Sequence, residues 1–292
     1  MAAAALLAVF LFASCASGEA EEDGRVRVVT SLQLFADFVE EVGGERVKVT
    51  SLVPGDADPH TYEPVPSQVA EITDADVVVL NGLGLEETLR DVIDNNVGSD
   101  IPVIEMAAGL PVIDESGDEH VFGNPHLWLN VRHAMRYVEN VRDALAEVDP
   151  RSAAVYQANA EAYLEELSAL DQEIAAAIES IPTERRKLVT FHDAFPYFAE
   201  RYGLEVVGVV VESPGREPSP QELAQLADRI RSESVPVVFI EPQFAGTILE
   251  AVARDTDVQV RTLLTGSFAG RVTSYVEMMR FDAQEIVQGL TE

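Results

Sequence analysis

Short apolar runs rich in Val and Ile alternate along the chain with longer stretches that carry apolar residues at helical spacing. The short runs predict buried β-strands, and the periodic stretches predict helices with one apolar face. The expected strands are residues 25–30, 47–53, 77–80, 102–105, 187–191, 205–211, 237–240 and 258–264. The expected helices are a segment between Ser31 and Gly43, residues 67–72, 86–95, 151–180, 195–202, 220–232, 247–253 and 274–290, and one that begins after Asn130. Such alternation predicts parallel sheets covered by helices. Ser31, Ser67 and Asn130 are the expected helix caps.

Residues 151–180 form the longest helical stretch, rich in Ala, Glu, Leu and Gln. At about 1.5 Å per residue, this stretch predicts a rod of roughly 45 Å. It separates two halves that each alternate strand and helix. The predicted fold is therefore α/β with two lobes, each built on a roughly four-stranded parallel sheet flanked by helices, and joined by one long rigid helix. We expect an N-terminal lobe at 25–149, the linking helix at 150–182 and a C-terminal lobe at 183–292.

The composition is globular, with 47% hydrophobic and 24% charged residues among 292. The net charge of −31 repels nucleic acid and anionic lipid headgroups, so nucleic-acid binding is not expected. The excess of acid would also concentrate cations near the surface. Solubility, for instance in a salty environment, explains the same charge equally well.

The first fifteen residues are almost wholly apolar and too short to span a bilayer, which fits the apolar core of a secretory signal peptide. Cys15, the only cysteine, closes this run in a sequence that resembles a bacterial lipobox, although Phe12 stands where Leu is usual. Lipidation of Cys15 would leave residues 16–24 as a flexible tether. An ordinary signal peptide with a chance cysteine is the alternative. Without another thiol, the ligands of any metal site must come from His, Asp and Glu.

Three histidines lie in loops or at strand ends. His60 follows the second strand, His126 lies in a loop before a helix, and His192 directly follows a strand. Ligands of open parallel sheets bind outside the carboxyl ends of the strands, and neutral imidazole is a good ligand for Zn²⁺. Taken singly, each residue is better explained as a hydrogen-bonded loop histidine, because the chain has no short H-x-x-H signature.

Six ordered motifs together resemble the zinc- and manganese-binding receptors of bacterial ABC importers, the ZnuA/TroA-like family. The motifs are GDADPHTYEP (55–64), VVVLNGLGLE (77–86), NPHLWLN (124–130), VTFHDAF (189–195), GREPSPQEL (215–223) and IEPQF (240–244). The resemblance covers essentially all of residues 25–291. It implies two α/β lobes, one rigid linking helix, metal in the interlobe cleft, and His60, His126 and His192 as the ligands.

The resemblance also implies a function. The chain would be an extracytoplasmic receptor, lipid-anchored and monomeric, that captures a metal and hands it to the membrane permease. It would not be an enzyme. Receptors with His at the third ligand position are usually associated with zinc, and those with Glu there with manganese. His192 therefore favours Zn²⁺, with Mn²⁺ as the second candidate, and imidazole nitrogen in place of a hard oxygen supports this physically.

One departure affects the fourth ligand, which in the family is usually an Asp in a T-D-S stretch. Here the stretch is Thr265-Gly266-Ser267. A water could complete a tetrahedron with three histidines. Alternatively Glu241, which directly follows a strand, could be the fourth ligand, or it could hydrogen-bond a ligating imidazole. Glu63 and Asp193 are other candidate acids.

An acidic loop at 114–120 falls where relatives often carry a histidine-rich loop. Asp118, Glu119 and His120 could collect metal there, and a solvated surface loop is the alternative. His133 is interpreted as a surface or packing histidine, and Trp128 as a core residue.

Two other functions fit parts of the sequence. Three histidines plus water would also suit a zinc hydrolase, although no H-E-x-x-H motif supplies a general base. A surface adhesin lipoprotein is the third alternative, and no motif indicates its partner. For the receptor, we expect metal binding to weaken below about pH 6, near the ordinary histidine pKa. We also expect limited hinge bending, with metal release by local loop rearrangement.

Overall fold

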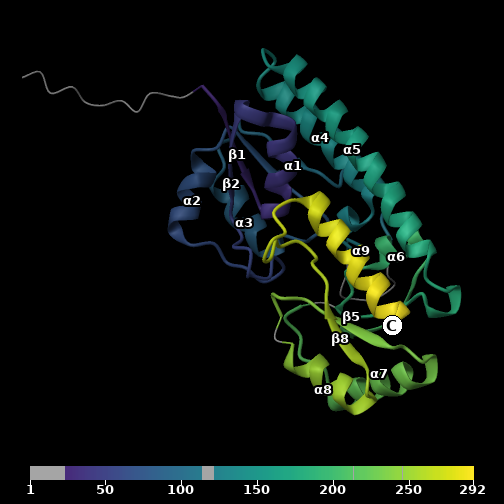
Figure 1. Cartoon of the computed structure of the whole chain (residues 1–292). Coiled ribbons are helices and arrows are strands. Elements are labelled where there is room, and N and C mark those ends of the chain that lie inside the picture. The colour runs from purple at the N-terminus through teal and green to yellow at the C-terminus, as the bar shows by residue number, and fades with distance from the viewer. Residues whose placement is uncertain (1–23, 114–121, 213, 245) are drawn as a thin grey trace, which may run out of the picture.

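A computed structural model of the chain describes residues 24–113, 122–212, 214–244 and 246–292 (Figure 1). The expected signal peptide at 1–15 with Cys15, most of the tether at 16–24, and the loop residues Asp118, Glu119 and His120 lie outside the described residues.

The N-terminal lobe contains a four-stranded parallel sheet in the order β2-β1-β3-β4. Its strands are β1 (Val26–Thr30), β2 (Val47–Ser51), β3 (Val77–Leu80) and β4 (Val103–Glu105). The accompanying helices are α1 (Gln33–Gly43), α2 (Pro66–Thr73) and α3 (Glu87–Asn96), with a 3₁₀ turn η1 (Gly44–Arg46). All four strands agree with the sequence pattern to within two residues at each end.

The C-terminal lobe repeats this plan with strand order β6-β5-β7-β8, again all parallel. Its strands are β5 (Lys187–His192), β6 (Glu205–Val211), β7 (Val237–Ile240) and β8 (Gln259–Thr262). Its helices are α6 (Pro196–Tyr202), α7 (Pro220–Glu233) and α8 (Thr247–Thr256), with a 3₁₀ turn η3 (Thr183–Arg185). The prediction of two four-stranded parallel sheets is confirmed.

Two long helices run along one side of both lobes, α4 (Val131–Val148) and α5 (Ala153–Glu179), preceded by the 3₁₀ turn η2 (Leu127–Leu129) (Figure 1). The 27 residues of α5 give a rod of about 40 Å. It packs against α1 of the first lobe and α6 of the second. The linking helix therefore packs against α4 and α9 rather than standing alone.

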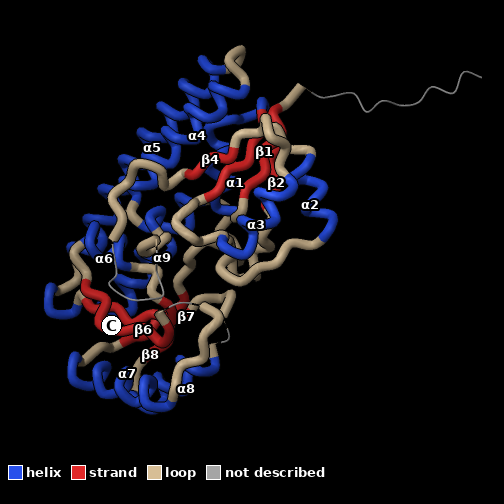
Figure 2. The backbone as a smooth tube through the Cα atoms, turned by 180° about the vertical axis from the view of Figure 1, so that it is seen from behind, coloured by secondary structure: helices blue, strands red, loops and turns tan. Residues whose placement is uncertain are grey.

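The C-terminal helix α9 (Tyr275–Thr291) does not stay within its own lobe. It packs against β8, but also against α1 and α5 (Figures 1 and 2). The ring of Tyr275 lies 4.8 Å from that of Phe38 in α1, measured between ring centres. One continuous hydrophobic core consequently contains residues of both lobes, and a second, smaller core lies between the C-terminal sheet and α7 and α8. This shared core is consistent with limited hinge bending.

Two expected helix caps are wrong and one is confirmed. Ser31 does not cap α1, because its hydroxyl donates to the buried carboxyl of Glu86 at 2.7 Å. Ser67 does not cap α2, which begins one residue earlier at Pro66. Pro at the first helical position has its fixed φ and needs no N–H partner there. Asn130 caps α4, since its side-chain oxygen accepts from the Arg132 backbone N–H at 3.0 Å.

No helix of the described residues combines the length and the apolar character that a membrane crossing requires.

Asp37 of α1 accepts a hydrogen bond from the Tyr275 backbone N–H at 2.8 Å, and burial raises its pKa to about 7. A raised carboxyl pKa means that the neutral form stabilises the fold and that this contribution is lost as the pH rises from about 4 to about 7. Asp37→Asn keeps the acceptor oxygen without the charge, so it should raise the free energy of unfolding at pH 8 by roughly 2 kcal/mol. This corresponds to a rise in melting temperature of about 4–8 °C.

The same substitution should have a much smaller effect at pH 4, where Asp37 is already neutral in the folded state. Asp37→Ala is the control, because it also removes the acceptor for Tyr275. Thermal unfolding followed by circular dichroism at both pH values measures the difference. An equal shift at pH 4 and pH 8 would contradict burial of a titrating carboxyl at this position.

Candidate metal centre

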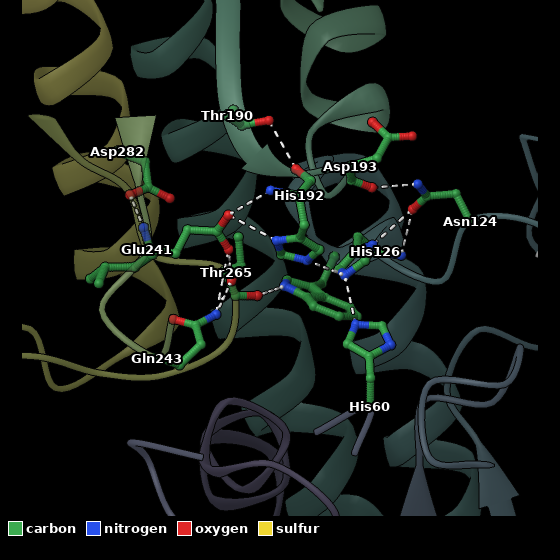
Figure 3. Close-up of polar contacts among 12 residues, drawn as sticks. His60, Asn124, His126, Thr190, His192, Asp193, Glu241, Gln243, Thr265 and Asp282 are labelled. Carbon is green, nitrogen blue, oxygen red and sulfur yellow. Dashed lines mark hydrogen bonds and ion pairs between the residues drawn. The ribbon is translucent and has the colours of Figure 1, made fainter. Parts of the chain in front are cut away.

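Three histidines from three separate segments converge between the lobes (Figure 3). His60 comes from the loop after β2, His126 immediately precedes η2, and His192 is the last residue of β5. The Nε2 atom of His126 lies 3.4 Å from that of His60 and 3.2 Å from that of His192. Ligand atoms of all three lie within 4.8 Å of one another. His126 and His192 are only 2% exposed, and His60 is half-buried.

The orientation of two rings is set by oxygen acceptors on their outer nitrogens. His126 Nδ1 lies 2.9 Å from the side-chain oxygen of Asn124, whose amide nitrogen donates to the Asp193 carbonyl at 2.7 Å. His192 Nδ1 lies 2.8 Å from Glu241 Oε1. Because both acceptors take a proton from Nδ1, each Nε2 presents a lone pair toward the centre. This is the arrangement that holds metal-binding imidazoles in proteins.

The spacing of two of the three nitrogen pairs fits a small tetrahedral ion. Zinc–nitrogen bonds of about 2.0–2.1 Å at tetrahedral angles separate two ligand nitrogens by about 3.3 Å. The Nε2 atom of His126 lies 3.2 Å from that of His192 and 3.4 Å from that of His60, on either side of that value. Without a cation between them, facing lone pairs at this distance would repel each other.

The three acids considered as candidates for a fourth ligand do not face the centre. Glu241 is fully buried, and its Oε2 accepts from the Thr265 hydroxyl at 2.7 Å while Oε1 faces the outer nitrogen of His192. Glu63 is exposed to solvent, and the carboxylate of Asp193 points away from the three rings (Figure 3). Among the described residues, no carboxylate joins the three-histidine group. The structure thus places Glu241 behind His192 rather than beside the ion position.

The histidines line a cavity of about 20 Å³ between loops of both lobes. A water molecule needs roughly 10–15 Å³, so the cavity has room for one ion or one water. Gly266 lines it at the position of the missing carboxylate. A Cβ atom built there would lie 3.2 Å from the terminal Cδ1 of Leu32.

A second polar network supports His126 from the N-terminal lobe. The Asn81 amide donates to the Pro125 carbonyl at 2.9 Å, and the Tyr137 hydroxyl donates to the Asn81 side-chain oxygen. Glu86 accepts from the Asn81 backbone N–H at 2.7 Å. Burial raises the pKa of Glu86 to about 7, against the lowering effect of its hydrogen bonds. The motif at 77–86 therefore fixes the backbone directly before His126.

Sequence reasoning missed the supporting residues Asn124, Gln243, Thr265 and Asn81. Asn124 and Asn81 lie in two motifs quoted above, next to a ligand and at the end of a strand, so a local signal existed for both. His133 is half-buried with its ring centre 5.5 Å from that of Tyr197, and burial lowers its pKa, as a packing histidine requires. Trp128 is a core residue as expected, and it also lines the cavity.

The fold and this site define a two-lobed metal receptor, and the comparisons with known proteins agree. The family model described as the zinc-uptake complex component A, periplasmic, matches residues 28–289, and this chain belongs to that family. The manganese-binding lipoprotein MntA of Halalkalibacterium halodurans is 37% identical over 281 residues, which cover 94% of this chain and 92% of the relative.

Solved structures show the same fold. A crystal structure of ZnuA has a TM-score of 0.83 and 32% identity, covering 91% of this chain and 100% of that one. The periplasmic zinc-binding protein TroA of Treponema pallidum has a TM-score of 0.86 and 29% identity, covering 92% and 100%. The family consists of substrate-binding receptors of metal ABC transporters and not of enzymes. Membership in it, with a cavity for one ion, excludes the hydrolase alternative.

Proposed function

We propose that this chain captures Zn²⁺ between His60, His126 and His192 and delivers it to the membrane permease of an ABC importer. The observation that carries the proposal is the convergence of three imidazole Nε2 atoms on one buried point, with ligand atoms within 4.8 Å of one another. Acceptors on the outer nitrogens of two rings leave the inner nitrogens unprotonated for a cation.

Zinc is preferred on the chemistry of the donors. Three neutral nitrogens suit Zn²⁺, whereas Mn²⁺ favours carboxylate and water oxygen. Mn²⁺ is the second candidate, because the relative MntA, 37% identical, is described as manganese-binding. A water completes the shell in this proposal, and Glu241 orients His192 instead of binding the ion.

We further propose that residues 1–15 are a signal peptide and that lipidation of Cys15 anchors the mature chain through the tether at 16–24. The receptor would act outside the cytoplasm as a monomer, and relatives of similar length are described as metal-transporter lipoproteins. The lobes are assigned to 25–149 and 183–292, with the linking segment at 150–182. Transient metal collection by Asp118, Glu119 and His120 is part of the same proposal.

Trp128 offers a direct test, because it is the only tryptophan and its ring centre lies 5.2 Å from that of His126. Addition of Zn²⁺ to the metal-free protein should change tryptophan emission saturably, with an end point at one ion per chain. Metal analysis of the purified protein should give the same stoichiometry. Competition with a chelator of known affinity then gives the dissociation constants for Zn²⁺ and Mn²⁺.

His133→Ala is the matched control, since His133 is a described histidine outside the cluster. It should bind Zn²⁺ like the wild type. Absence of stoichiometric binding in the wild type would overturn the proposed function. Tighter binding of Mn²⁺ than of Zn²⁺ would keep the receptor but reverse the choice of ion.

A further inference from the structure

The loop that follows β8 lies behind two of the histidines at once. Thr265 is 2% exposed and makes contacts toward both. Its hydroxyl donates to Glu241 Oε2 at 2.7 Å, and the other oxygen of Glu241 holds His192 Nδ1. Its carbonyl accepts from the Trp128 indole N–H at 2.7 Å, and Trp128 packs against the ring of His126. Thr265 thus contacts the residues that support both His192 and His126.

The direction of the hydroxyl proton is fixed by a third contact. Gln243 Nε2 donates to Thr265 Oγ1 at 2.7 Å, so the hydroxyl oxygen accepts from Gln243 and gives its proton to Glu241 (Figure 3). Glu241 is fully buried, and each of its oxygens needs a donor. Loss of the hydroxyl would leave Oε2 with only the weaker contact to Gln243 at 3.4 Å. Glu241 would then be free to shift, and with it the ring of His192.

The loop itself is held from outside the site. The Leu264 backbone N–H donates to Asp282 Oδ1 of α9 at 2.8 Å. The Tyr275 hydroxyl, from the same helix, donates to the Trp128 carbonyl at 2.7 Å. Because α9 fixes both the loop and the backbone of Trp128, the position of Thr265 relative to the two histidines is set by packing and not by the ion.

We propose that Thr265 is a positioning residue whose hydroxyl sets the orientation of His192 through Glu241, while its carbonyl holds Trp128 against His126, so that the β8–α9 loop determines how well the site fits its ion. This inference deepens the proposed function and rests on it. Removal of a hydrogen-bonding partner of a metal ligand typically lowers the affinity for the metal by about 10–100-fold.

The test compares Thr265→Ser with Thr265→Ala, a pair that differs only by the hydroxyl. Chelator competition should give a Zn²⁺ dissociation constant for the Ser variant within about threefold of the wild type, and for the Ala variant about 10–100-fold higher. Thr265→Val adds a shape-matched variant and should behave like Ala. Thr256→Val is the control, because the Thr256 hydroxyl in α8 contacts only carbonyls of its own helix, those of Val252 and Ala253.

The outcomes separate the two hypotheses. If wild type does not bind Zn²⁺, the proposed function fails. If wild type binds and the Ser and Ala variants have equal affinities, the role of Thr265 is overturned while the receptor stands. A merely structural role would lower the melting temperatures of the Ala and Val variants but would not separate Ser from Ala in affinity once all are measured well below unfolding.

Discussion

Replacing His192 by alanine is expected to weaken Zn²⁺ binding by a factor on the order of 10³ or more. The substitution removes one of three protein ligands, and the remaining pair would hold a tetrahedral ion only weakly, with water in the other positions. It also leaves Glu241 buried without the imidazole N–H that it accepts at 2.8 Å. An unpaired buried carboxylate adds a cost to the metal-free protein as well.

The measurement is chelator competition, with His133→Ala as the histidine control. His192→Gln provides a second variant that retains a polar side chain near Glu241 and so lessens any folding defect. If both His192 variants bind one Zn²⁺ per chain as tightly as the wild type does, the assignment of the site is wrong. Zn²⁺ bound at His60 and His126 alone should instead exchange rapidly and be lost on dialysis.

The second large effect is expected from Gly266→Asp, which places a carboxylate at the position where the family resemblance implies one. Gly266 lines the cavity, and an added Cβ would lie 3.2 Å from the terminal Cδ1 of Leu32 and 3.9 Å from the Trp128 ring. A hard oxygen ligand replaces water and adds negative charge to the site. We expect the affinity for Zn²⁺ to rise about tenfold and the affinity for Mn²⁺ to rise more. The difference between the two dissociation constants should therefore become smaller.

Gly266→Asn is the matched control, because it has the same shape and no charge. Gly266→Ala separates the effect of the Cβ atom on Leu32 from that of the functional group. Parallel titrations with Zn²⁺ and Mn²⁺ give the ratio of dissociation constants for each variant. Equal ratios for the Asp and Asn variants would show that no carboxylate reaches the ion from this loop.

The sheets could be predicted from the sequence because their strands are short β-branched runs bounded by turns. The strands at 77–80, 205–211 and 237–240 match β3, β6 and β7 at both ends. Caps were less predictable. A serine before a helix looks the same whether it caps the helix or, as Ser31 does, satisfies the buried carboxyl of Glu86.

The site likewise has features that local sequence predicts and features that it does not. Strand ends indicated where His60 and His192 would lie within each lobe, but only the family resemblance placed them together. The support around them depends on contacts between distant residues. Trp128 and Thr265, for example, are 137 positions apart. No local pattern reveals such a pair, because each residue alone is compatible with an ordinary core or loop position.

The path of α9 has a consequence for the order in which the chain acquires its structure. Phe38 of α1 packs against Tyr275, near the opposite end of the sequence, as well as against Tyr137 and Tyr163. Newly made N-terminal segments therefore lack this last ring until α9 has been made, and contacts so distant along the chain form slowly. The N-terminal lobe consequently reaches its full packing only after the final helix of the chain has left the ribosome.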